Sequence, residues 1–152
     1  MQSLAELLTP GRTLCKTPGA SKKRVFDTLA SVIAEDQISL NQHDVFTQLI
    51  AREKLGSTGL GQGIAIPHCR IANCTHPIGT LMTLDSPVDY DSMDNEPVDL
   101  LFALLVPEEA QQQHLDILAS IARLFSQKSF CAALRGASSN EELHRIAVQW
   151  AE

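Results

Sequence analysis

The stretch GSTGLGQGIAIPH, residues 56–68, decides how the rest of this chain is interpreted. It holds four glycines within eight positions, at Gly56, Gly59, Gly61 and Gly63. Glycine lets a backbone take a positive φ or approach a ligand closely. The spacing therefore predicts a loop that a ligand can approach.

A short apolar segment follows the glycines and ends in a proline and a histidine. Residues 63–66 have the composition of a short buried strand. Pro67 ends this strand because it has no N–H to donate, and it restricts Ile66 to extended backbone. We therefore expect His68 to lie at a stiff strand end.

Around this stretch the chain alternates helical and strand patterns. Apolar residues at helical spacing predict two helices before it, one capped by Ser21 and one running from Asn41 to about Lys54. The run 100–106 is continuously apolar, as expected of a strand covered on both faces. Further elements are expected at residues 3–8, 12–16, 78–84, 111–125, 129–134 and 139–150.

These elements predict an α/β or α+β fold in which helices pack on a sheet. The 152 residues and 44% hydrophobic composition suit a single domain over residues 1–152, with a core from about 5 to 150. The first residues lack a signal peptide pattern, and no apolar run reaches the roughly 18 residues of a membrane span. The four scattered cysteines are expected to be reduced, which favours a cytoplasmic protein.

Charge is distributed unevenly along the chain. Residues 71–152 hold four Lys or Arg and twelve Asp or Glu, which gives this part a net charge of −8, whereas the whole chain has a net charge of −6. Such a chain lacks the basic surface that nucleic acid requires, so we expect no nucleic-acid partner. The acidic segment 85–99 is either a solvated loop or a docking edge for a basic partner.

His68 is the main candidate for chemistry. A neutral imidazole can attack phosphorus with one nitrogen while the other donates a hydrogen bond that fixes the tautomer. Phosphoryl transfer also needs donors around the phosphoryl oxygens, and Arg52, just upstream of the loop, suits this role. Alternatively Arg52 is a solvated residue at a helix end. The other predicted pocket residues are Ser57, Thr58, Gly59, Gly61 and Gly63.

His114 is the second candidate. It opens a helix shortly after the apolar strand ends, and both histidines follow predicted strand ends, where sites collect in open α/β sheets. The spacing of His114, Leu118 and Ile121 equally fits a histidine packed in the core, with Leu115 beside that face.

The same segment contains residues that could support other chemistries. His68, Cys69, Cys74 and His76 are four potential zinc ligands, but adjacent ligands without a C-x-x-C gap argue against a zinc module. A hydrolase that uses Ser57 with His68 and an Asp is not favoured, because such a set of residues is too common to indicate a hydrolase. A P-loop kinase is excluded because no G-K-[ST] follows the glycines. No metal and no cofactor are therefore expected.

The segment 52–68 closely resembles the signature of fructose/mannitol-type enzyme IIA phosphocarriers of the bacterial phosphotransferase system. The segment 94–107, followed by His114 and Leu115, is similar to the nitrogen-regulatory branch, enzyme IIA-Ntr. Cys69 and Arg70 depart from the glycine and lysine expected there.

The resemblance implies a mixed sheet with helices on both sides. It further implies that His68 accepts a phosphoryl group from an HPr-like carrier (NPr), with Arg52 and His114 lining the pocket and His114 stabilising the phosphoryl group or the imidazole. Regulatory members act on partners such as potassium-transport components and sensor kinases. The alternative is a sugar-transport EIIA that passes phosphate to a separate IIB.

Overall fold

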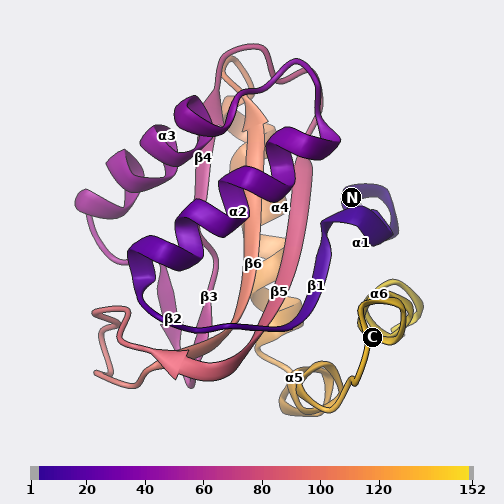
Figure 1. Cartoon of the computed structure of the whole chain (residues 1–152). Coiled ribbons are helices and arrows are strands. Elements are labelled where there is room, and N and C mark those ends of the chain that lie inside the picture. The colour runs from indigo at the N-terminus through magenta and orange to yellow at the C-terminus, as the bar shows by residue number, and fades with distance from the viewer. Residues whose placement is uncertain (1–3, 151–152) are drawn as a thin grey trace.

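The chain folds into a mixed sheet between two layers of helices (Figure 1). The computed structural model describes residues 4–150. Its helices are α1 (Leu4–Leu7), α2 (Lys22–Asp36), α3 (Gln42–Lys54), α4 (Gln111–Phe125), α5 (Lys128–Arg135) and α6 (Asn140–Gln149), with a 3₁₀ turn at Pro10–Arg12. Its strands are β1 (Thr13–Thr17), β2 (Gly59–Gly61), β3 (Ile64–Ala65), β4 (His68–Ile71), β5 (Ile78–Val88) and β6 (Val98–Pro107).

The sheet is built around β6. The strand order is β1-β5-β6-β3-β2, and β4 also pairs with β6. β5 pairs with β6 in antiparallel direction, whereas β3 and β4 both pair with β6 in parallel. The sheet is therefore mixed, as predicted, and β6 contacts strands on both of its edges.

Side chains of β6 alternate between two cores. Leu101, Ala103 and Leu105 pack with α2 and α3, while the intervening Phe102 and Leu104 pack with the α1, α4, α5 and α6 side. This alternation is what the pleat of a strand requires. The prediction of a strand covered on both faces is confirmed, and Figure 1 shows α2 and α3 across one face with α4 behind the other.

Three helices are capped by the side chain that precedes them, including the predicted cap Ser21. The Ser21 hydroxyl accepts a hydrogen bond from Arg24 N at 3.1 Å, and the Asn41 side chain accepts one from Asp44 N at 2.8 Å. Ser139 caps α6 in the same way. Each cap satisfies an amide that the helix itself leaves unpaired. No helix within residues 4–150 is long and apolar enough to cross a membrane.

The glycine-rich stretch is not the open loop that the sequence predicted. Gly59–Gly61 forms β2, which pairs antiparallel with β3. The turn between them needs positive φ at Gly61 (90°), Gln62 (58°) and Gly63 (81°). Two of these three positions are glycine because left-handed backbone is costly for other residues. The glycines thus build a tight hairpin.

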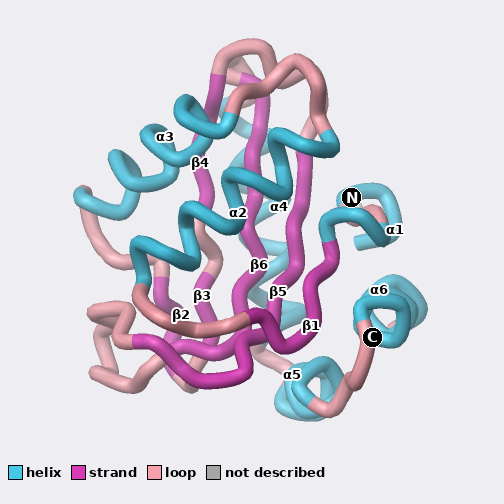
Figure 2. Tube along the Cα trace, in the orientation of Figure 1, coloured by secondary structure: helices cyan, strands magenta, loops and turns pink. Residues whose placement is uncertain are grey.

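His68 begins a strand rather than ending one. The predicted strand 63–66 is shorter, and His68–Ile71 forms β4, which the sequence interpretation missed. The Pro67 carbonyl still accepts a hydrogen bond from Leu104 N at 2.9 Å, so the chain stays against β6 across the interruption. Figure 2 shows β3 and β4 following one line along β6, separated by a short non-strand segment.

We predict that Phe102→Ala lowers the free energy of unfolding by about 3–5 kcal/mol, because it leaves a cavity in the core. Phe102 is fully buried and its ring centroid lies 5.8 Å from that of Phe125. Urea denaturation of both proteins measures the difference. Met93→Ala, at a side chain that is 92% exposed, is the control and should change stability by less than about 0.5 kcal/mol. Equal stability losses for the two variants would contradict the described core.

Candidate phosphoryl-transfer site

A hollow of about 670 Å³ opens where α3, β4 and α4 meet. It contains the three residues predicted to do the chemistry, Arg52, His68 and His114. Each comes from a different element, so only the fold brings them together. The other lining residues are Gln48, Ala51, Leu55, Cys69, Arg70 and Glu108.

The ring of His68 is held by its own backbone neighbourhood. Nδ1 of His68 lies 2.7 Å from the carbonyl oxygen of Ile66. A carbonyl can only accept, so Nδ1 carries the proton and the lone pair resides on Nε2. Pro67, between the two residues, limits the movement of the carbonyl. The ring is therefore oriented as a nucleophile with Nε2 free.

His114 faces His68 across the hollow. The two ring centroids are 5.4 Å apart with an interplanar angle of 63°. Within the described residues, Nδ1 of His114 is buried without a hydrogen-bond partner. Because a buried N–H is rarely left unpaired, this favours the proton on Nε2. The predicted apolar face of this helix was partly wrong: Ile117 is buried, whereas Leu115 is 59% exposed.

Burial and positive charge keep both imidazoles neutral. Burial lowers the pKa of His68 and Arg52 lowers it further, while the hydrogen bond to Ile66 and the Glu53 carboxylate oppose this shift. Burial likewise lowers the pKa of His114, with contributions from His68, Arg70 and Arg52. A neutral imidazole is the form that can act as a nucleophile.

Arg70 lines the hollow, and the sequence interpretation did not assign it to the site. Residues two apart on a strand point to the same face, so Arg70 shares the face of His68 on β4. β4 is only four residues long, too short to show a clear period of two, and no strand was expected after His68, so the sequence interpretation did not place Arg70 in the site. Arg52 and Arg70 together place two permanent positive charges at one site.

The other predicted pocket residues are not among those that line this hollow. Thr58 is buried and donates its hydroxyl to Glu53 Oε2 at 2.6 Å. The Ser57 hydroxyl accepts from Gly59 N at 3.1 Å. Gly61 and Gly63 belong to the β2–β3 turn, which packs against Asp94, Asp99 and Arg135. These residues were expected as phosphate donors; in the structure the hydroxyls of Thr58 and Ser57 make hydrogen bonds to neighbouring residues of the chain.

The potential zinc ligands are not arranged around a common point. No group of three or more His, Cys, Asp or Glu side chains in residues 4–150 is placed to hold a metal ion. Cys69 and Cys74 are buried thiols in the core under α2 and α3. Burial raises the pKa of Cys69 to about 12, so it stays a neutral thiol beside His68.

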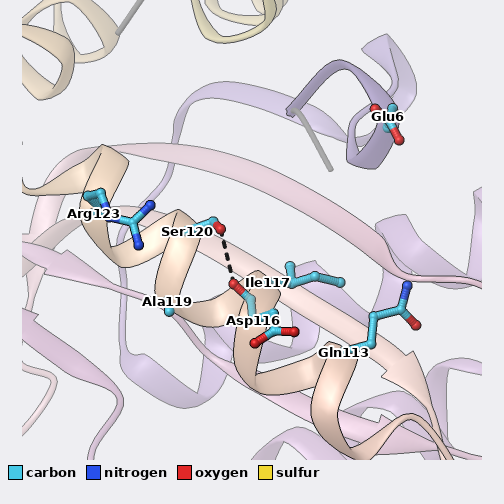
Figure 3. A pocket seen from close by; sticks show the side chains of 7 residues that line it. All are labelled: Glu6, Gln113, Asp116, Ile117, Ala119, Ser120 and Arg123. Carbon is cyan, nitrogen blue, oxygen red and sulfur yellow. Dashed lines mark hydrogen bonds between the residues drawn. The ribbon is translucent and has the colours of Figure 1, made fainter. Parts of the chain in front are cut away.

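A second hollow, of about 590 Å³, lies between α1 and α4 (Figure 3). Its walls include Gln113, Asp116, Ser120 and Arg123, and the Ser120 hydroxyl donates to the Asp116 carbonyl at 3.0 Å. It is lined by none of the predicted site residues. The predicted catalytic residues Arg52, His68 and His114 line the first hollow instead.

Residues 6–149 match the family model described as "Phosphoenolpyruvate-dependent sugar phosphotransferase system, EIIA 2". The chain belongs to this EIIA family. A "Nitrogen regulatory protein" of Pseudomonas aeruginosa is 48% identical over 148 residues, covering 97% of this chain and 96% of that relative. A protein of the same name from Escherichia coli is 41% identical over 144 residues, covering 94% and 88%.

Solved EIIA structures share this fold. The nitrogen regulatory protein IIA-Ntr of Neisseria meningitidis has a TM-score of 0.88 and 43% identity, covering 95% of this chain and 98% of that one. The mannitol IIA of E. coli has a TM-score of 0.75 at 16% identity, covering 92% and 98%, and supports the fold alone. The expected EIIA fold and its nitrogen-regulatory branch are thus confirmed.

We predict that His68 of this EIIA protein titrates below the ordinary histidine pKa of about 6.5. The unfolded chain then binds the proton first, so the free energy of unfolding falls as the pH drops from about 6.5 to the lowered pKa. NMR titration of the imidazole measures the value. Arg52→Gln should raise the pKa of His68, because it removes a positive charge that opposes protonation. A His68 pKa above 6.5 in the unaltered protein would contradict this electrostatic description.

Proposed function

We propose that His68 accepts a phosphoryl group from an HPr-like phosphocarrier (NPr), and that the phosphorylation state of this protein controls regulatory partners. The supporting observation is the free Nε2 of His68, held by the hydrogen bond to Ile66 in a hollow that contains Arg52 and Arg70. The names of the relatives support the regulatory part of the proposal.

The transfer step follows from this geometry. The Nε2 lone pair attacks phosphorus, and the bond between phosphorus and the donor nitrogen breaks, returning that electron pair to the donor. The proton stays on Nδ1 of His68, which continues to donate it to the Ile66 carbonyl. Arg52 and Arg70 stabilise the phosphoryl oxygens, and Nε2–H of His114 donates to one of them. The products are a phosphohistidine on this chain and a dephosphorylated donor.

Phosphorylation would act as a regulatory signal by changing the charge of the hollow. A phosphoryl group adds about −1.5 to −2 charges at neutral pH. Leu55, which lines the hollow, and Leu115, which follows the lining residue His114, are both exposed. Partners such as potassium-transport components or sensor kinases would then distinguish the two states. We place this exchange in the cytoplasm, because the four cysteines are free thiols, as is usual in a reducing compartment.

A sugar-transport role is the second candidate. A fructose-specific EIIABC component of Bacillus subtilis is 30% identical over 147 residues, covering 96% of this chain and 23% of that protein. Its identity is lower than that of the nitrogen regulatory relatives, which favours the regulatory role. Rapid phosphoryl transfer to a purified fructose-type IIB domain would favour the sugar-transport role instead.

We predict that phosphorylated HPr-like carrier labels this protein with one acid-labile phosphate on His68. His68→Ala should abolish the label because no other nitrogen occupies that position in the hollow. Phosphorus-32 labelling followed by peptide mapping measures it. His76→Ala is the matched control, since His76 is an exposed histidine outside the hollow, and should label normally. Full labelling of His68→Ala would refute the proposal.

We further predict that Arg52→Gln slows labelling about 100-fold, the usual effect of removing one preorganised donor. Arg70→Gln should slow it less, since Arg70 is more exposed than Arg52. Single-turnover kinetics with the phosphorylated carrier measure both rates. Arg24→Gln, at an exposed arginine on α2, controls for the loss of one positive charge and should not change the rate. Unchanged kinetics in Arg52→Gln would remove this residue from the mechanism.

A further inference from the structure

A buried carboxylate lies next to Arg52 in the sequence, and the transfer step above does not use it. Glu53 is 9% exposed in the last turn of α3. Its Oε1 accepts from Thr58 N at 2.9 Å, and its Oε2 accepts from the Thr58 hydroxyl at 2.6 Å. The Tyr90 hydroxyl lies 3.4 Å from Oε2. A carboxylate held by this many donors has a fixed position.

Lys22 supplies the balancing charge. Its ammonium lies 2.9 Å from Glu53 Oε1 and donates to the Tyr90 carbonyl at 3.0 Å. It also sits 4.2 Å from the centre of the Tyr90 ring. Buried charges are tolerated when they are paired and hydrogen-bonded, and both conditions hold here. The cluster of Lys22, Glu53, Thr58 and Tyr90 thus joins α2, α3, the glycine-rich segment and the acidic segment.

This cluster controls the surroundings of Arg52 in two ways. First, the two Glu53–Thr58 hydrogen bonds close the chain over residues 53–58, which contains the Gly56 carbonyl that accepts from Arg52 at 2.9 Å. Second, Lys22 forms an ion pair with the carboxylate of Glu53, the residue that follows Arg52 in the sequence. None of the ion pairs within residues 4–150 includes Arg52, so its charge remains available for a phosphoryl group.

We propose that Glu53, neutralised by Lys22, is a positioning residue that holds Arg52 in the orientation needed to bind the phosphoryl group on His68. This inference rests on the proposed function. Glu53 does not touch the reacting atoms. It acts by fixing the segment 53–58 through its hydrogen bonds to Thr58, and by keeping its negative charge paired with Lys22 instead of with Arg52.

A charge effect on His68 separates this role from simple structural support. The charged or titratable groups around His68 are Arg52 and Glu53 from α3, Cys69 and Arg70 from β4, Glu108 after β6, and His114 from α4. Among them Glu53 raises the pKa of His68 and Arg52 lowers it. Removing the negative charge of Glu53 must therefore lower the pKa of His68 further.

The test compares Glu53→Gln with two reference variants of the full chain. Glu53→Gln should lower the His68 pKa measured by NMR and slow labelling about 10- to 100-fold, as expected for a misplaced binding group. The slowing should occur with the phosphorylated carrier and with phosphoramidate, a small donor that needs no docking surface. Tyr90→Phe alters the same cluster without changing charge and should leave the His68 pKa unchanged. Glu35→Gln, at an exposed glutamate, should match the unaltered protein in both measurements.

Variants of Lys22 test the same idea independently and keep it testable if Glu53→Gln does not fold. Lys22→Met should slow labelling because it leaves the negative charge of Glu53 uncompensated, so that this charge attracts Arg52 away from the phosphoryl group, and Lys22→Arg should restore the rate. Wild-type labelling and a wild-type His68 pKa in Glu53→Gln, or equal rates for Lys22→Met and Lys22→Arg, would overturn the inference. If the unaltered protein itself is not labelled, the proposed function fails instead, while the effect of Glu53→Gln on the His68 pKa still tests the cluster.

Discussion

The site depends on one hydrogen bond, from Nδ1 of His68 to the carbonyl of Ile66, 2.7 Å long. The geometry of this hydrogen bond is fixed because the backbone around it cannot move freely. Pro67 restricts its own φ and the conformation of Ile66, and its carbonyl is tied to Leu104 of β6 at 2.9 Å. The buried central strand thus determines which imidazole nitrogen carries the proton. The pairing of this segment with β6 therefore fixes both the local fold and the orientation of the His68 ring.

Around this fixed imidazole, the protein separates charges that would otherwise cancel. Arg52 and Arg70 line the hollow, whereas the buried Glu53 is paired with Lys22. Burial and the nearby arginine keep His68 neutral, so the ring can act as a nucleophile at physiological pH. The arrangement suits a dianionic group arriving from solvent better than a metal ion or a neutral substrate.

The sequence predicted the features that depend on local chemistry. The caps at Ser21 and Asn41 and the doubly covered strand β6 follow from composition and spacing, and the structure confirms them. β2 and β4 were missed because segments of three and four residues carry no clear period, and they become strands by pairing with distant partners. The gathering of Arg52, His68 and His114 was expected from the resemblance. Arg70 and the Glu53–Lys22 pair were not, because both follow from tertiary placement.

The most direct test of the central claim is to identify which nitrogen of His68 carries the phosphoryl group. Long-range ¹H–¹⁵N and ³¹P NMR of the phosphorylated, ¹⁵N-labelled protein distinguishes the two ring nitrogens. The hydrogen bond to Ile66 predicts phosphorylation at Nε2, with Nδ1 still protonated. Phosphorylation at Nδ1 would contradict this account, because that nitrogen would first have to give up its proton and its carbonyl partner.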